Sequence, residues 1–276
     1  MKILNLLPPR LVGNNGFVKL VDVLPRVITQ EAYDSGLMCD SAVVQAARVS
    51  YSAGTKKKND DIGLIHYLYK NAHTTPFEMV QFKFHIKAPL FVIRQWQRHR
   101  MSTFNEISGR YSVMTDSFWI PDNFRKQSSI NKQSSEEPLE QELNNKLIGE
   151  YMSKLRDSYS FYNYLLNQGV SREMARTILP VASTSEFYWK IDLHNLLRFI
   201  LLRSDSHAQQ EIRDYSDTIK NIISEYCPIS LSAFEEYSTG TIKFSNTEIK
   251  AFKNKGLIKS KSGLVDFERK LKIINE

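Results

Sequence analysis

The sequence has few of the residues that build several common kinds of site. It carries only two cysteines in 276 residues, Cys39 and Cys227, and neither belongs to a paired-cysteine motif. This usage argues against a disulfide framework and against a cysteine zinc site. It favours a reducing compartment, so we expect a cytoplasmic protein with no metal centre.

Glycine is also sparse, and its spacing carries no nucleotide motif. The eleven glycines form neither G-x-G-x-x-G nor a Walker A loop, and H-E-x-x-H and G-x-S-x-G are missing as well. Any phosphate must therefore be held by Arg, Gln and Ser side chains and by exposed backbone N–H groups. Guanidinium groups suit this task because they bind phosphate oxygens in a bidentate manner.

Long apolar runs are missing too. No stretch approaches the ~18 residues that a transmembrane helix needs, so we expect no membrane association. The N-terminal stretch MKILNLLPPRLVGNNG is a poor signal peptide because its apolar run is short and contains two prolines. With 42% hydrophobic and 24% charged residues, the composition indicates a soluble globular protein.

The positive charge is concentrated at one end. Residues 241–276 carry +5 of the net +7, and the remainder of the chain is nearly balanced. We interpret residues 1–240 as one folded domain and 241–276 as a basic C-terminal extension, solvated or disordered. The near-neutral main body weakens the case for a nucleic-acid partner.

Strands and helices are mixed without a regular βαβ rhythm. This predicts an α+β fold with a central, mostly antiparallel sheet packed with long helices. The strongest strand pattern is the alternation over 79–88, and residues 17–24 and 181–191 are further strands. Helices are expected over 39–51 with Asp40 as N-cap, over 62–72, near 139–168, and from an Asp192 N-cap onward with a break near 204–205.

Two further segments can be interpreted from the sequence, a helix that begins at Pro89 and a polar segment over 125–145. Pro89 suits the first turn of a helix, which we extend to about Arg100. Residues 125–145 are polar and biased in composition, and we interpret them as a mobile insertion with a helical end.

Cationic side chains are crowded in RQWQRHRMSTFNEISGRYS, residues 94–112. Its Arg and His residues are separated by Ser, Asn and Glu rather than by lysines. On the predicted helix Arg94 and Arg98 lie four residues apart on one face. The arrangement fits either a surface ion-pair patch or an anion site for a nucleotide.

Two later segments repeat the pattern. Arg172 and Arg176 share a helix face, where like charges repel unless an anion or solvent separates them. Arg203 falls on the apolar stripe of the helix after Asp192, and burying a lone guanidinium is costly. It therefore either pairs with a carboxylate such as Asp192, extends to solvent, or serves a ligand.

Four blocks, in order, resemble the flavin-dependent thymidylate synthases. They are HTTPFE (73–78), the 94–112 stretch with its RHR and following Ser108, MARTILP (174–180) and LLRSDSHAQQEI (201–212). The resemblance runs from about Val18 to Tyr237 and leaves out both the insertion and the tail. It implies the fold of the thymidylate synthase-complementing proteins.

The resemblance also implies an activity. That activity is reductive methylation of dUMP to dTMP, with 5,10-methylenetetrahydrofolate as carbon donor, FAD reduced by NADPH as hydride donor, and tetrahydrofolate released. A homotetramer with active sites at subunit interfaces is implied as well. The FAD contacts implied are His73, Thr75, Arg98, His99, Arg100, Glu106, Asp192, Leu193, His194 and Arg198.

The implied nucleotide contacts overlap with these. They are Gln95, Trp96, Gln97, Arg98, Glu106, Ile107, Ser108, Gly109, Arg110, Arg176 and Arg203. The resemblance gives Arg203 the catalytic role of contacting the pyrimidine and favouring loss of its N3 proton. A desolvated cation beside an imide stabilises the anion. Ser108 has no assigned base, so a hydrogen bond to the nucleotide is favoured over covalent attack.

A competing hypothesis is a non-enzymatic RNA- or single-strand-binding protein. It would use the Arg and Tyr clusters together with the basic tail. It predicts a colourless protein whose nucleic-acid affinity falls steeply with salt. The flavoenzyme hypothesis predicts a yellow one.

Overall fold

The computed structural model describes residues 1–49, 60–129, 131–252 and 261–275. The chain divides into two compact units, Met1–Ala233 (unit 1) and Phe234–Glu276 (unit 2). The assignment of residues 1–240 as one catalytic domain stays a prediction.

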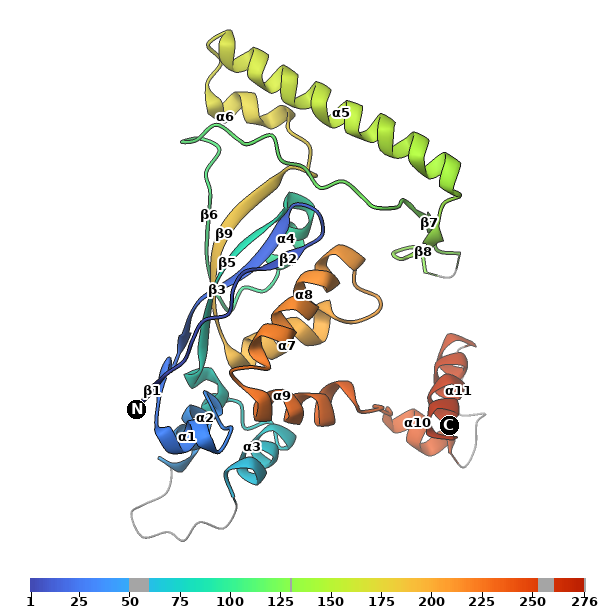
Figure 1. Cartoon of the computed structure of the whole chain (residues 1–276). Coiled ribbons are helices and arrows are strands. Elements are labelled where there is room, and N and C mark those ends of the chain that lie inside the picture. The colour runs from blue at the N-terminus through green and yellow to red at the C-terminus, as the bar shows by residue number, and fades with distance from the viewer. Residues whose placement is uncertain (50–59, 130, 253–260, 276) are drawn as a thin grey trace. The chain divides into compact units, whose positions relative to one another are not determined.

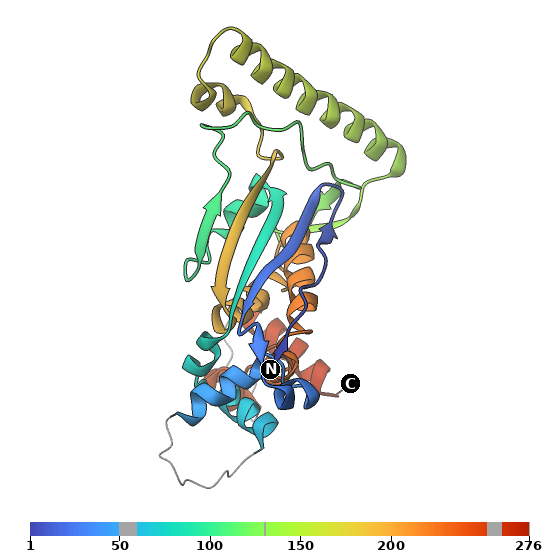
Figure 2. The ribbon, with the colours of Figure 1, turned by 60° about the vertical axis from the view of Figure 1, so that its left-hand side comes forward.

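The central element of unit 1 is a five-stranded antiparallel sheet (Figures 1 and 2). The predicted α+β fold with an antiparallel sheet is therefore confirmed. In sheet order the strands are β2 (Arg10–Val12), β3 (Gly16–Leu24), β5 (Gln81–Pro89), β9 (Thr184–Asp192) and β6 (Thr103–Glu106). A second small sheet pairs β1 (Lys2–Ile3) with β4 (Val27–Ile28).

The two faces of the sheet differ as the alternating sequence requires. Phe82 and Phe84 of β5 and Trp189 of β9 are fully buried on one face. Lys83 and Lys190, which are paired across β5 and β9, are exposed on the other. Because neighbouring side chains of a strand point to opposite faces, one face carries the core.

Two helices cover the apolar face. They are α7 (Leu193–Arg203) and α8 (Gln210–Ile223), separated at the predicted break, and they pack on each other and on the sheet (Figure 1). Asp192 caps α7 as predicted, because its carboxylate accepts the Asn195 N–H at 2.9 Å. Tyr215 of α8 donates its hydroxyl to the Lys87 carbonyl of β5 at 2.8 Å.

The helix that follows Pro89 is shorter than predicted. It is α4, Leu90–Trp96, with Gln97 as C-cap. The extension to Arg100 was wrong because the apolar periodicity ends at Trp96, and Ser102 Oγ then donates to the His99 carbonyl at 2.9 Å. Arg98 to Arg100 therefore lie in a turn beyond the helix.

Short helices gather near one end of the sheet. They are α1 (Gln30–Asp34), α2 (Asp40–Arg48), α3 (Asp61–Lys70), the 3₁₀ turn η1 (Thr75–Met79) and α9 (Pro228–Phe234). Asp40 was wrongly predicted to cap its own helix, whose N-cap is Cys39. Its carboxylate instead accepts the Ile229 N–H at 2.7 Å and the Ser230 N–H at 3.2 Å, in the first turn of α9.

The polar insertion is structured over most of its length. Strands β7 (Arg125–Gln127) and β8 (Ser135–Pro138) form a hairpin, and α5 (Gln141–Asn167) follows. The prediction of a mobile segment was wrong because side chains tie the hairpin: Ser128 Oγ donates to Glu136 at 2.8 Å. Helix α5 lies beyond the end of the sheet opposite α1–α3 (Figures 1 and 2) and packs through Leu155 against Phe118 and Ala182. After it come α6 (Arg172–Ala175) and the 3₁₀ turn η2 (Arg176–Ile178).

Unit 2 corrects the prediction of a solvated or disordered tail. It contains the π-helical turn η3 (Glu235–Thr239), α10 (Asn246–Ala251) and α11 (Lys261–Asn275). Phe244, Phe252 and Phe267 bring their ring centroids within 5.1–6.2 Å of one another. Lys270 pairs with Glu248 at 2.7 Å, so part of the basic charge is used inside the unit. Among the described residues, no helix is long and apolar enough to cross a membrane.

Candidate active site

The Arg-rich turn is fixed by a buried aromatic cluster. Trp96, the last residue of α4, is fully buried. Its ring centroid lies 5.3 Å from Phe187, 5.2 Å from Trp189 and 4.9 Å from Phe199. Because α4, β9 and α7 meet at this one side chain, the turn that follows it has a defined position.

Arg203, at the end of α7, reaches across to that turn. Its Nε donates to His99 Nε2 at 3.0 Å, and one of its terminal nitrogens donates to the Gln95 carbonyl at 3.1 Å. No carboxylate pairs with Arg203 among the described residues, so of the three alternatives the pair with Asp192 or another acid is wrong. Asp192 instead accepts from Asn195. Because the partners of this half-buried guanidinium are uncharged, no carboxylate in the described part of the chain compensates its positive charge, and an anionic ligand could do so.

His99 is electrically neutral in this arrangement. Burial of the ring and the positive charges of Arg203 and Arg198 lower the pKa of His99 to about 4. Arginine has no acceptor, so Nε2 of His99 must accept and Nδ1 carries the proton. Burial and the charge of Arg98 likewise lower the pKa of Arg203.

Positive charge exceeds negative charge around this contact. Arg98, Arg100 and Arg198 are exposed, and the electrostatic effects of Arg98 and Arg198 reach Arg203 and His99. Glu106 of β6 is half-buried and accepts a 3.4 Å hydrogen bond from Gln97. The guanidinium groups of Arg98, Arg198 and Arg203 thus act on one another or on His99, and an anion would neutralise this surplus.

A second group of predicted residues lies beside α6 and the first residue of η2. Gly109 is buried, and a Cβ there would lie 3.0 Å from Cδ of Arg176 and 2.9 Å from Sδ of Met114. Arg110 pairs with Glu173 at 3.2 Å, and its backbone N–H is 3.3 Å from Ser108 Oγ. The structure thus unites Ser108, Gly109, Arg110 and Arg176. We find no direct contact from these four to Arg203 or His99 in the part of the chain that the structure describes.

A third group lies where η1 packs against α7 and β9. The Leu193 N–H donates to the Val80 carbonyl at 2.8 Å, which sets the start of α7 beside the end of η1. His73 and Thr75 are exposed here, and His194 is half-buried. His73 also lies edge-on to Tyr67, with ring centroids 5.9 Å apart.

Some predicted contacts lie deep in the protein. The side chains of Trp96 and Leu193 are fully buried, whereas Ile107 is half-exposed. Sequence reasoning missed Glu173, the partner of Arg110, and Gln209, whose Oε1 accepts from Gln95 Nε2 at 2.7 Å. Gln209 lies inside the 201–212 block, but nothing in that block indicates its partner.

The donor set fits phosphorylated ligands. The surplus guanidinium groups and the half-buried Ser108 match the charge and acceptors of a pyrophosphate and a monophosphate. Among the described residues, no group of three His, Cys, Asp or Glu side chains could hold a metal ion. Fold and site together define an α+β protein with a candidate site for phosphorylated ligands beside α4 and α7.

Comparison with known proteins narrows this class. The family model described as "Thymidylate synthase complementing protein" matches residues 36–229. The chain is 45% identical over 267 residues to the flavin-dependent thymidylate synthase of Dictyostelium discoideum, covering 95% of this chain and 86% of the relative. It is 46% identical over 242 residues to a flavin-dependent thymidylate synthase of Thermus thermophilus, covering 88% of this chain and 84% of that relative.

A solved structure is also similar. The UMP/dUMP methylase PolB from Streptomyces cacaoi, bound with 5-Br dUMP, has a TM-score of 0.70 at 27% identity, covering 82% of this chain and 97% of that one. The chain belongs to the thymidylate synthase complementing protein family.

Proposed function

We propose that this protein is a flavin-dependent thymidylate synthase. It reductively methylates dUMP to dTMP, taking the carbon from 5,10-methylenetetrahydrofolate and releasing tetrahydrofolate, with FAD reduced by NADPH. The observation that carries the proposal is the guanidinium surplus around Arg203 and His99, in a chain 45% identical to an enzyme of that name.

FAD is the redox group of the proposal, and when bound it supplies the hydride. The exposed guanidinium groups of Arg98, Arg100 and Arg198 would hold its pyrophosphate through charge-assisted hydrogen bonds. Further FAD contacts would come from the η1 region and the start of α7. They are His73, Thr75, Asp192, Leu193 and His194. Neutral His99 adds a donor at Nδ1 without adding charge.

The nucleotide would bind to residues that partly overlap with the FAD contacts. Gln95, Gln97 and Glu106 offer amide and carboxylate groups to the base and sugar, while Ser108, Arg110 and Arg176 offer donors to the phosphate. Arg110 also pairs with Glu173. Ser108 acts as a hydrogen-bond donor in this proposal, because no base lies within the contacts that the structure gives it.

Arg203 is the proposed catalytic residue. Its guanidinium is half-buried and its hydrogen-bond partners are uncharged, so its full positive charge is available to a pyrimidine. A cation beside the imide lowers the cost of removing the N3 proton, and loss of that proton raises the electron density at the ring carbon that attacks the methylene group.

Assembly belongs to the same proposal. Among the described residues, no direct contact joins the Ser108–Arg176 group to the Arg203–His99 group, and a homotetramer with sites at subunit interfaces would bring such groups together from different copies. We also propose a cytoplasmic location.

Thymidylate formation tests the function. Flavin-loaded protein supplied with dUMP, methylenetetrahydrofolate and NADPH should form dTMP, and omitting any one of the three should stop it. A folded, flavin-loaded sample that forms no dTMP contradicts the proposal. A colourless protein whose binding to single-stranded nucleic acid weakens steeply with salt would instead support the competing hypothesis.

A further inference from the structure

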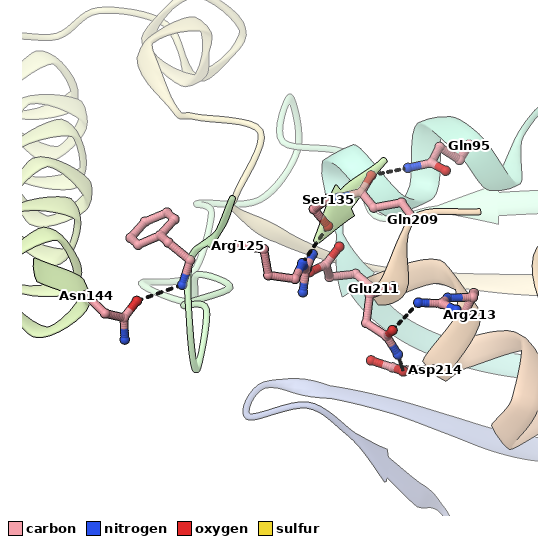
Figure 3. Close-up of polar contacts among 10 residues, drawn as sticks. Gln95, Arg125, Ser135, Asn144, Gln209, Glu211, Arg213 and Asp214 are labelled. Atoms are coloured by element: carbon pink, nitrogen blue, oxygen red, sulfur yellow. Dashed lines mark hydrogen bonds and ion pairs between the residues drawn. The ribbon is translucent and has the colours of Figure 1, made fainter. Parts of the chain in front are cut away.

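We infer that Arg125, in the polar insertion, is a positioning residue for nucleotide binding. Arg125 is the first residue of β7, and its side chain reaches α8 (Figure 3). It acts through Glu211 and Gln209 on Gln95. The inference rests on the proposed function, and none of these contacts was evident from the sequence.

The first contact is an ion pair with a buried carboxylate. A terminal nitrogen of Arg125 donates to Glu211 Oε1 at 2.7 Å, and Arg125 Nε donates to Ser135 Oγ of β8 at 2.9 Å. The side chain of Glu211 is only 8% exposed. Arg125 is the charged partner that the structure gives Glu211 among the described residues, so removing Arg125 leaves a buried charge unpaired.

The second contact joins this pair to the site. Glu211 lies in the first turn of α8, where a carboxylate is stabilised by the helix dipole. Gln209, the N-cap residue of α8 two positions earlier, accepts from Gln95 Nε2 at 2.7 Å. Figure 3 shows both contacts along the same edge of α8.

The third contact reaches the proposed catalytic residue. The Gln95 carbonyl accepts from Arg203 at 3.1 Å, while the Gln95 side chain is held by Gln209. The start of α8 therefore sets the rotamer of Gln95 next to Arg203. The hairpin fixes that start through the Arg125–Glu211 pair, which gives the insertion a role in binding rather than in chemistry.

Steady-state kinetics of the flavin-loaded enzyme test the inference. Arg125→Ala should raise the KM for dUMP about tenfold and leave kcat within about threefold, because positioning is lost but the reacting groups remain. Arg125→Lys, which keeps the charge, should recover part of the KM. Lys126→Ala is the matched control, since Lys126 pairs with Glu137 inside the hairpin at 3.0 Å, and the KM of this variant should not change.

A double-mutant cycle separates positioning from stability. Gln209→Ala should raise the KM for dUMP, and adding Arg125→Ala should raise it little further, because both act through Gln95. An unchanged KM in Arg125→Ala, or full additivity in the double variant, overturns the inference. If Arg125→Ala does not fold, Glu211→Gln replaces it, because it removes the ion pair with Arg125 and keeps an uncharged side chain of the same size; an unchanged KM in Glu211→Gln, beside a raised KM in Gln209→Ala, overturns the inference. Failure of the proposed function is distinct, because wild-type enzyme would then form no dTMP.

Discussion

At the scale of single residues, the main feature of the candidate site is the positive charge of Arg203 and its neighbours. Arg203 contacts the neutral ring of His99 and a backbone carbonyl, and the charge of Arg98 disfavours its protonated form. Such a group gains most when an anion arrives, because a ligand removes both repulsion and incomplete solvation. The predictions for Arg203, His99 and Gly109 follow from this.

Arg203→Ala should lose turnover and keep its flavin. We expect kcat/KM for dUMP to fall about 10²–10³-fold, the usual effect of removing one group that stabilises developing charge. Activity and flavin absorbance are measured on the same sample. Loss of flavin with unchanged activity per bound flavin would contradict the catalytic role.

The ionisation of His99 should depend on Arg203. In the flavin-free protein we expect its pKa near 4, and Arg203→Ala should move it toward 6.5, as followed by NMR titration of the imidazole. The pKa of His99 is lower in the folded protein than in the unfolded chain, so the unfolded chain binds more protons between pH 4 and 6.5. The free energy of unfolding should therefore decrease as the pH falls from 6.5 to 4. A wild-type pKa near 6.5 would refute the assigned environment.

Gly109→Ala should displace Arg176. The new Cβ would lie 3.0 Å from Cδ of Arg176, so that side chain must move, and we expect a several-fold rise in the KM for dUMP. Gly149→Ala in α5 is the control: its Cβ meets nothing within 4 Å, and it should only stabilise the helix, by about 0.5–1 kcal/mol. Equal KM values for the two variants would be the contrary result.

At the scale of elements, the features set by local sequence could be predicted, whereas those set by long-range contacts could not. The β5 alternation and the Asp192 cap were predictable because they depend on neighbouring residues. The end of α4 was not, because long-range ring contacts fix Trp96 and local bonds then shape the turn. The closeness of Arg176 to Gly109 likewise depends on tertiary contacts that no sequence spacing encodes.

Asp40 links two helices far apart in sequence, so its removal should destabilise unit 1. Burial raises its pKa to about 7, while the hydrogen bonds from Ser230 and Ile229 act in the opposite direction. We expect Asp40→Ala to lower the free energy of unfolding by about 2–4 kcal/mol, since it leaves buried donors in the first turn of α9 unsatisfied. Asp40→Asn, which keeps an acceptor, should cost less. A denaturant melt in which both variants match wild type would count against this capping role.

At the scale of the whole chain, the two units differ in their aromatic residues. All three tryptophans, Trp96, Trp119 and Trp189, lie in unit 1, while unit 2 has a phenylalanine core. The family model ends at residue 229, close to the boundary between the units. Sequence composition indicated the boundary region but not the folded state of unit 2, because three separated phenylalanines leave no periodic pattern.

Phe267→Ala should unfold unit 2 selectively. Phe267 is fully buried, and deleting a buried phenylalanine costs about 3–5 kcal/mol, a large loss for so small a unit. Helical circular dichroism should decrease, while the thermal melt followed by tryptophan fluorescence stays unchanged. Phe252→Ala, at a residue 53% exposed, is the milder control. A matching shift in the tryptophan melt would show that the units unfold together.

A crystal structure of the protein with FAD and dUMP tests the central claim most directly. We predict that the Arg203 guanidinium lies within hydrogen-bond distance of the uracil ring, and that Arg98 and His99 lie beside the flavin nucleotide. Both ligands bound elsewhere, with Arg98, His99 and Arg203 surrounded by solvent, would contradict the account.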